Sequence, residues 1–222
     1  MTGYELYQLV RKRHPHLEER LLSDNDLVEI IGNCKESFRA NCGELRRLSF
    51  PIVIDAIIKF VKRGGLFETT CGRLIYGKDG LNPLIKALHE QGLLGNGAHI
   101  CYSFETPLNQ VMFGATHVFI ADDGVQLFVE EPHGCIENID YATKRKGILI
   151  DNDQDLAQVI EGFVWSWDFV EVFSVDDDSA KANTLNDGDV RWNEDAFCSF
   201  ETEDEFGECI SKRAELAFVE GD

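Results

Sequence analysis

Cys42 has the sequence surroundings of a nucleophile. It lies in Asn41-Cys42-Gly43-Glu44, at the start of a long apolar segment that we expect to be helical. A thiol at the beginning of a helix is close to the positive end of the helix dipole and to unpaired backbone amides, which favour the thiolate. The same amides can bind an oxyanion, and Gly43 leaves room for a substrate beside the sulfur. The alternative is the common fate of a lone cysteine, a small buried residue.

A histidine and a carboxylate are predicted to face each other on one hairpin. His117 opens the first of two short apolar runs, which are separated by Asp123-Gly124. Asp-Gly between two such runs indicates a tight turn. A two-residue turn pairs His117 with Glu130, and a three-residue loop pairs it with Glu131. In either register a carboxylate lies about 5 Å from the histidine, measured between Cβ atoms, and can orient the imidazole.

Together these motifs resemble the papain-like and transglutaminase-like cysteine enzymes, and more narrowly their bacterial effector and toxin members. The shared features are Asn-Cys-Gly-Glu at a helix start, a later His-Val-Phe-Ile strand, and an acid-proline step about fourteen residues further on. The resemblance covers residues 41–132. It implies Cys42 as nucleophile, His117 as general base and Glu131, which precedes Pro132, as the orienting acid.

Two further features remain open. Asn41 or Arg39 is a candidate second donor to an oxyanion, and Cys34, near another helix end, is an alternative nucleophile.

The elements that must position these residues follow from periodicity and capping signals. Apolar residues at helical spacing, bounded by proline, glycine and N-cap residues, predict five helices. Short β-branched or aromatic runs predict four strands. The helices run from Tyr4 to before His14-Pro15, from Ser23-Asp24 to Gly32, from Cys42 to Arg63 with a kink or break at Pro51, from Leu81 to Gln91, and from Asp153 to Trp167; the strands are 99–104, 117–121, 125–130 and 169–175.

Most of the predicted helices precede the predicted strands, which indicates an α+β protein. The resemblance implies a papain-like fold, with N-terminal helices packed on a C-terminal antiparallel sheet. We expect one papain-like cysteine enzyme domain at residues 1–175 and an acidic C-terminal extension at residues 176–222.

The net charge of −19 is concentrated in that extension. Residues 176–222 carry 15 acidic and 4 basic residues, hence 11 of the 19 excess negative charges. Such a segment repels nucleic-acid phosphates, which argues against direct nucleic-acid binding. It favours a protein substrate with a basic surface.

The seven cysteines indicate a reducing compartment. Their number is odd and none stands in CxxC spacing, which favours free thiols over disulfides and argues against a structural zinc site. We predict no metal and no cofactor. No apolar stretch approaches the roughly 20 residues of a membrane helix, and the N-terminal residues lack the apolar core of a secretory signal. We expect a cytoplasmic protein with no membrane partner, which as an effector would be translocated by a specialised secretion system.

The sequence thus predicts a cysteine-dependent amide hydrolase acting on a protein, either a deamidase or a protease. Both reactions begin with thiolate attack on an amide carbonyl, so the sequence does not separate them, and an acyltransferase would use the same triad. The alternative is a non-catalytic acidic binding module, such as an immunity or inhibitor protein or a nucleic-acid mimic. The oligomeric state is not predicted.

Overall fold

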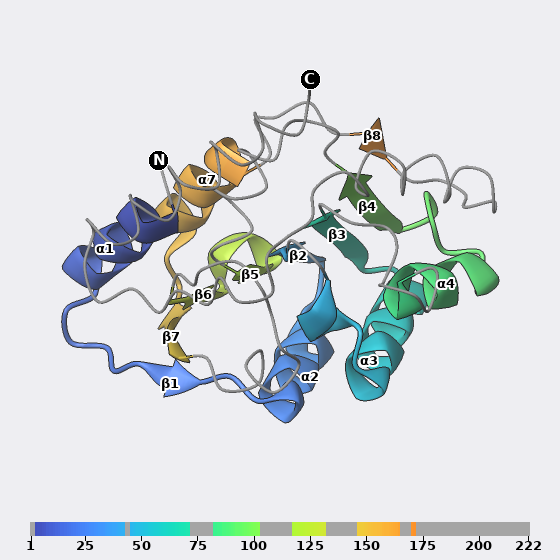
Figure 1. Ribbon diagram of the computed structural model, residues 1–222, viewed down its shortest axis with the longest axis horizontal. Coiled ribbons are helices and arrows are strands. Elements are labelled where there is room, and N and C mark those ends of the chain that lie inside the picture. Colours follow the sequence, from blue (N-terminus) through green and yellow to red (C-terminus); the bar gives the residue numbers. More distant parts are fainter. Residues whose placement is uncertain are drawn as a thin grey trace, which may run out of the picture.

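The computed structural model describes residues 3–42, 45–71, 82–102, 117–131, 146–164 and 170–171. These residues form an eight-stranded sheet with helices on both of its faces (Figure 1). The strands are β1 (Arg20–Leu21), β2 (Ser37–Asn41), β3 (Leu66–Cys71), β4 (Ala98–Tyr102), β5 (Val118–Ala121), β6 (Gln126–Glu130), β7 (Lys146–Asp151) and β8 (Val170–Glu171). The helices are α1 (Gly3–Arg13), α2 (Asp24–Asn33), α3 (Pro51–Lys62), α4 (Pro83–Glu90) and α7 (Gln154–Val164), with short 3-10 helices at Arg46–Leu48 and Asp122–Gly124.

The direction of strand pairing changes at β2. On one side β2 pairs in parallel with β3, and β3 pairs in parallel with β4. On its other side β2 pairs antiparallel with β5, and the antiparallel pattern continues through β6 and β7 to β1. The full order is β1-β7-β6-β5-β2-β3-β4-β8. Because parallel neighbours need a crossover, α3 connects β2 to β3 and α4 connects β3 to β4.

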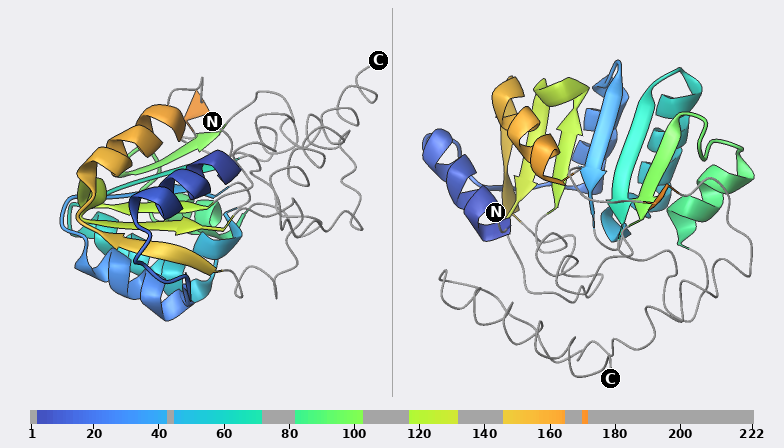
Figure 2. Two further views of the ribbon diagram at one scale, coloured as in Figure 1. Left: turned by 90° about the vertical axis from the view of Figure 1, so that its left-hand side faces the viewer. Right: turned by 90° about the horizontal axis from the view of Figure 1, so that it is seen from above.

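Two apolar layers enclose the sheet. Figure 2 shows α1 and α7 over one face and α2 and α3 over the other. On the α2 and α3 face, phenylalanine rings of β3, β2, β5 and β6 form a row across the sheet, with neighbouring centroids 6.1, 6.2 and 6.3 Å apart. All four rings are buried, so this row anchors the larger core. They are Phe67, Phe38, Phe119 and Phe128.

Several predicted elements are confirmed, and each has a strong local signal. α1 ends before His14-Pro15 as expected, and α2 begins after Ser23, whose side chain accepts from the Asp26 amide in a capping box. α4 follows the N-cap Asn82. The predicted hairpin is present as antiparallel β5 and β6.

The helix predicted from Cys42 to Arg63 is wrong in its first half. The helix α3 begins only at Pro51, with Phe50 in an extended conformation as its N-cap. Proline suits the first turn of a helix, where its missing amide hydrogen has no partner to lose, and it disfavours helical geometry in the residue before it. Pro51 therefore starts the helix, whereas the prediction placed it as a kink or break inside a helix that begins at Cys42.

The structure is α+β, but the predicted arrangement of helices followed by one antiparallel sheet is wrong. Helices and strands alternate, and the strands β2 and β3, which the sequence prediction lacked, supply the parallel part of the sheet. Their polar positions hid them, because β2 carries Arg39 and Asn41, and β3 carries the buried Thr69 and Thr70. Asn41 and Thr70 satisfy each other, since the Thr70 hydroxyl donates to the Asn41 side-chain oxygen at 2.6 Å.

The predicted boundary between residues 175 and 176 lies outside the described residues, as does the acidic extension. None of the helices in the described ranges is both long and apolar enough to cross a membrane.

Replacing Gly147 with alanine is expected to destabilise the sheet. An added Cβ would lie 2.5 Å from the carbonyl oxygen of Val129 and 2.5 Å from Cζ of Phe128, so β6 and β7 would have to separate. We expect the free energy of unfolding, measured by urea denaturation, to fall by about 1–3 kcal/mol. Gly162→Ala is the control, because nothing lies within 4 Å of the added atom and α7 should gain up to about 1 kcal/mol. Equal stability of the two variants would contradict this packing.

Candidate active site

The carboxyl edge of the parallel strands collects the polar residues of the candidate site. The strands β2 and β3 end together at this edge, β5 begins there because it runs antiparallel to β2, and β6 ends there because it runs antiparallel to β5. Cys42 directly follows β2, His117 directly precedes β5, and Glu130 is the last residue of β6. Open sheets with parallel strands bind ligands outside the carboxyl ends of those strands.

His117 and Glu130 form a buried pair across β5 and β6. The Glu130 amide donates to the His117 carbonyl at 2.9 Å, and the imidazole Nδ1 lies 2.8 Å from Oε2 of Glu130. His117 is 3% exposed and Glu130 is 0% exposed. A carboxylate at Nδ1 favours the tautomer with the proton on that nitrogen, which places the lone pair of the ring on Nε2.

Arg47 completes the buried cluster from the segment before α3. Its Nε lies 3.5 Å from Oε1 of Glu130, and the side chain is 1% exposed. Its other nitrogens contact the carbonyl oxygen of Leu22 and, at 3.5 Å, Oδ1 of Asp24. A carboxylate out of contact with water needs such a positive neighbour, since an uncompensated buried charge costs several kcal/mol.

Sequence reasoning missed Arg47. The available signal was a charged residue between Leu45 and Leu48, both of which are fully buried. An arginine flanked by core residues on a short segment indicates a buried partner of opposite charge.

Cys42 lies next to this cluster, but without the helix that was expected to activate it. The register of β2 and β5 pairs Asn41 with Val118, so Cys42 and His117 are the next positions on the two strands. The thiol is 0% exposed and belongs to the core under α2 and α3. Because α3 begins only at Pro51, its dipole and its first amides do not act on the sulfur.

The acid beside His117 is Glu130, and Glu131 lies elsewhere. The structure has the register that pairs His117 with Glu130, one of the two registers derived from the Asp-Gly turn. Glu131 is the next residue, so it points to the opposite face of the sheet, and it is exposed. Its amide donates to the carbonyl oxygen of Lys146 at 2.9 Å.

The other residues that the sequence suggested for the site, Cys34, Asn41 and Arg39, have contacts that stabilise the fold. Burial raises the pKa of Cys34 to about 12, so this thiol is almost entirely protonated at neutral pH. Asn41 is bonded to Thr70, and Arg39 to carboxylates. Within the described residues, no group of three or more histidine, cysteine or acidic side chains is arranged to hold a metal ion.

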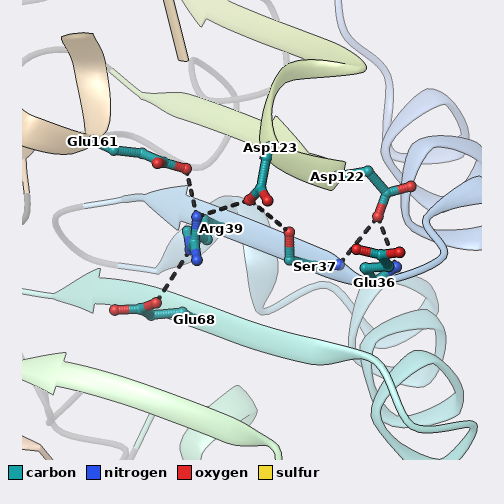
Figure 3. A network of polar contacts seen from close by, with 7 residues as sticks. All are labelled: Glu36, Ser37, Arg39, Glu68, Asp122, Asp123 and Glu161. Carbon is teal, nitrogen blue, oxygen red and sulfur yellow. Dashed lines mark hydrogen bonds and ion pairs between the residues drawn. The ribbon is translucent and has the colours of Figure 1, made fainter. Parts of the chain in front are cut away.

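A second polar network connects the β5-β6 turn to β2 (Figure 3). The Arg39 guanidinium contacts Glu161 at 2.6 Å, Asp123 at 3.0 Å and Glu68 at 3.3 Å. The Asp122 carboxylate accepts hydrogen bonds from the backbone amides of residues 35, 36 and 37, at 2.8 to 3.1 Å. This network lies at the edge opposite His117 and holds the turn in place.

The Asp122 carboxyl is stabilised in its charged form. Burial alone would raise its pKa, but the three backbone amides outweigh burial and hold the pKa below its ordinary value.

No protein-family model and no curated protein matches the chain. Among solved structures, the chain is similar to a phospholipase D family member, Nuc from Salmonella typhimurium, with a TM-score of 0.47 and 18% identity over 67% of this chain and 89% of that one. It is also similar to NucT from Helicobacter pylori, with a TM-score of 0.45 and 13% identity over 68% of this chain and 95% of that one.

The structure corrects the resemblance to papain-like cysteine enzymes. The parallel pairing of β2 with β3 and of β3 with β4 departs from the single antiparallel sheet that the resemblance implied. The predicted cysteine-triad amide hydrolase, whether deamidase, protease or effector toxin, is wrong as well. Cys42 is buried in the core and lacks the helix N-terminus that the thiolate chemistry required. The non-catalytic alternative depended on residues 176–222, which lie outside the described residues.

Replacing Asp122 with asparagine should weaken the turn and change its response to acid. The folded pKa lies below the unfolded value near 3.9, so the charged carboxylate stabilises the fold above about pH 4, and this contribution is lost as the pH falls through the folded value. We expect Asp122→Asn to cost about 1–2 kcal/mol near pH 7, with a smaller difference from wild type below about pH 3. Urea denaturation across this pH range measures the effect.

Asp55→Asn is the control, because Asp55 makes an exposed ion pair with Lys59 within one helix and should cost no more than about 0.5 kcal/mol. A pH-independent difference between wild type and Asp122→Asn would refute the electrostatic explanation.

Proposed function

We propose that this protein is a hydrolase of phosphodiester bonds, with His117 as its reacting group. The observation that carries the proposal is the buried imidazole whose Nδ1 lies 2.8 Å from Glu130, at the carboxyl edge of the parallel strands. Histidine oriented through Nδ1 by a carboxylate is a recurrent arrangement for a base or a nucleophile.

The proposed reaction proceeds in two displacements. In the first, the Nε2 lone pair of His117 attacks phosphorus, an N–P bond forms, the ester P–O bond breaks, and the leaving alkoxide takes a proton from solvent. In the second, water attacks phosphorus, the N–P bond breaks, and the water proton is released as the phosphate monoester leaves. Imidazole is itself a nucleophile, so phosphoryl transfer at this site requires no serine or thiol.

The charges of the cluster suit an anionic substrate. Arg47 lies beside the carboxylate that orients the ring and offsets its negative charge, although Arg47 also contacts the partly exposed Asp24. A lone carboxylate beside the imidazole would repel a phosphodiester approaching Nε2.

The overall charge narrows the substrate class. A chain with a net charge of −19 repels a polyanion, so the proposal retains the expectation that nucleic acid is not bound directly. We therefore propose a small diester with a single negative charge as the substrate. The predicted protein substrate belonged to the amide-hydrolase hypothesis, and it is replaced here by this diester.

Hydrolysis of bis(p-nitrophenyl) phosphate, followed by release of nitrophenolate, tests the proposal. We expect turnover by the wild-type chain, a loss of about 10²–10⁴-fold in His117→Gln, and slower turnover on a single-stranded DNA oligonucleotide of equal diester concentration. Rapid acid-free quenching should capture an N-phosphorylated protein in the wild type and none in His117→Gln.

Two matched controls locate the activity. Glu130→Gln should reduce the rate by about 10–100-fold, whereas Glu131→Gln, one residue away on the other face, should remain within about threefold of wild type. Cys42→Ala should also retain activity. Circular dichroism establishes that each variant is folded. Absence of turnover on any diester, or full activity in folded His117→Gln, would reject the proposal.

A further inference from the structure

Arg47 is bound from two sides, which distinguishes it from an ordinary ion-pair partner. One side contacts Glu130 through Nε, and the other contacts the Leu22 carbonyl and the Asp24 carboxylate. Leu22 and Asp24 flank Ser23, the N-cap of α2, so the guanidinium spans from the start of that helix to the end of β6. Guanidinium is planar and presents its donors in a fixed fork, so these contacts restrict its orientation.

The two oxygens of Glu130 have different partners. Oε1 faces Arg47 at 3.5 Å, and Oε2 faces Nδ1 of His117 at 2.8 Å. A carboxylate without a second partner is able to rotate about its last bond, and then either oxygen, or neither, lies in the plane of the imidazole. A guanidinium held 3.5 Å from Oε1 favours one of these rotations through charge attraction, and it supplies the positive charge that a carboxylate at 0% exposure requires.

We infer that Arg47 is a positioning residue for the reacting histidine. It acts through Glu130, keeping that carboxylate ionised and rotated toward His117, and so fixes the imidazole tautomer with the proton on Nδ1 and the lone pair on Nε2. The effect on catalysis rests on the proposed function, whereas the effect on the tautomer is a property of the folded protein and requires no substrate. Arg47 touches no substrate atom in this role.

The tautomer is observable directly in protein labelled with ¹⁵N at the histidine rings. In the wild type we expect one ring, assigned to His117 by its absence from His117→Gln, to have a protonated Nδ1 and an unprotonated Nε2. In Arg47→Met we expect that signal to move toward a mixture of tautomers. Under the proposed function, kcat should fall by about 10–100-fold while KM stays within about threefold, because only the orientation of the attacking imidazole has changed.

Arg63→Met is the matched control. Its guanidinium also binds main-chain carbonyls, those of Ile31, Gly32 and Cys34 at the other end of α2, but it contacts neither Glu130 nor His117 among the described contacts. Its loss should lower the stability of the fold and leave the His117 tautomer unchanged. An equal tautomer shift in both variants would show a general structural effect and would overturn the inference.

A double-mutant cycle keeps the test decisive if Arg47→Met alone does not fold. In Arg47→Met/Glu130→Gln no unpaired charge is buried, which is the change that buried ion pairs tolerate best. If Arg47 acts through Glu130, the double variant should match Glu130→Gln in both tautomer and kcat, so that the two effects do not add. Additive effects would overturn the inference.

The two proposals fail separately. If no diester is hydrolysed but the tautomer depends on Arg47, the positioning role stands and the proposed function falls. If diesters are hydrolysed and folded Arg47→Met retains the wild-type tautomer and kcat, the proposed function stands and Arg47 has no positioning role.

Discussion

The buried carboxylate of Glu130 is the group around which the site is organised. It is fully enclosed by protein, and a charge in that position persists only with opposite charge and hydrogen-bond donors close to it. Those neighbours come from distant parts of the chain, Arg47 before α3 and His117 before β5. Glu130 thus connects the start of α2, through Arg47, to the β5-β6 hairpin. It also sets the orientation of the His117 imidazole.

The sheet brings these residues to one edge because β2 has a parallel neighbour on one side and an antiparallel neighbour on the other. Parallel pairing with β3 directs the end of β2 toward the carboxyl edge, and antiparallel pairing with β5 makes the hairpin begin at that same edge. If β5 ran parallel to β2, His117 would lie at the opposite edge, beside the network of Arg39 and Asp122. The two polar networks therefore occupy opposite edges, one holding the turn and the other forming the site.

Sequence signals that act within a few residues correctly predicted the end of α1, the start of α2 and the hairpin. The N-cap Ser23, the proline after α1 and the Asp-Gly turn act within a few residues, and the elements that they predicted are present. The same turn also limited the acid to Glu130 or Glu131, and only the observed register decides between them. β2 and β3 were missed because their buried polar side chains are satisfied by partners remote in sequence, and Arg47 was missed because its counter-charge is 83 positions away in the chain.

The surroundings of Cys42 and of His117 differ for one physical reason, which is the short range over which an activating group acts. Reactivity of a thiol at this position depended on a helix N-terminus, and Pro51 moves that terminus nine residues downstream. Orientation of the imidazole depended only on a carboxylate across a hairpin, which either register of the turn would supply. The antiparallel pairing of β2 with β5 places Cys42 and His117 next to neighbouring strand ends, yet the groups that activate a side chain act over only a few ångströms. Among the described contacts, the imidazole has a carboxylate oxygen 2.8 Å from its Nδ1, and the proposed reaction therefore uses the imidazole and not the sulfur.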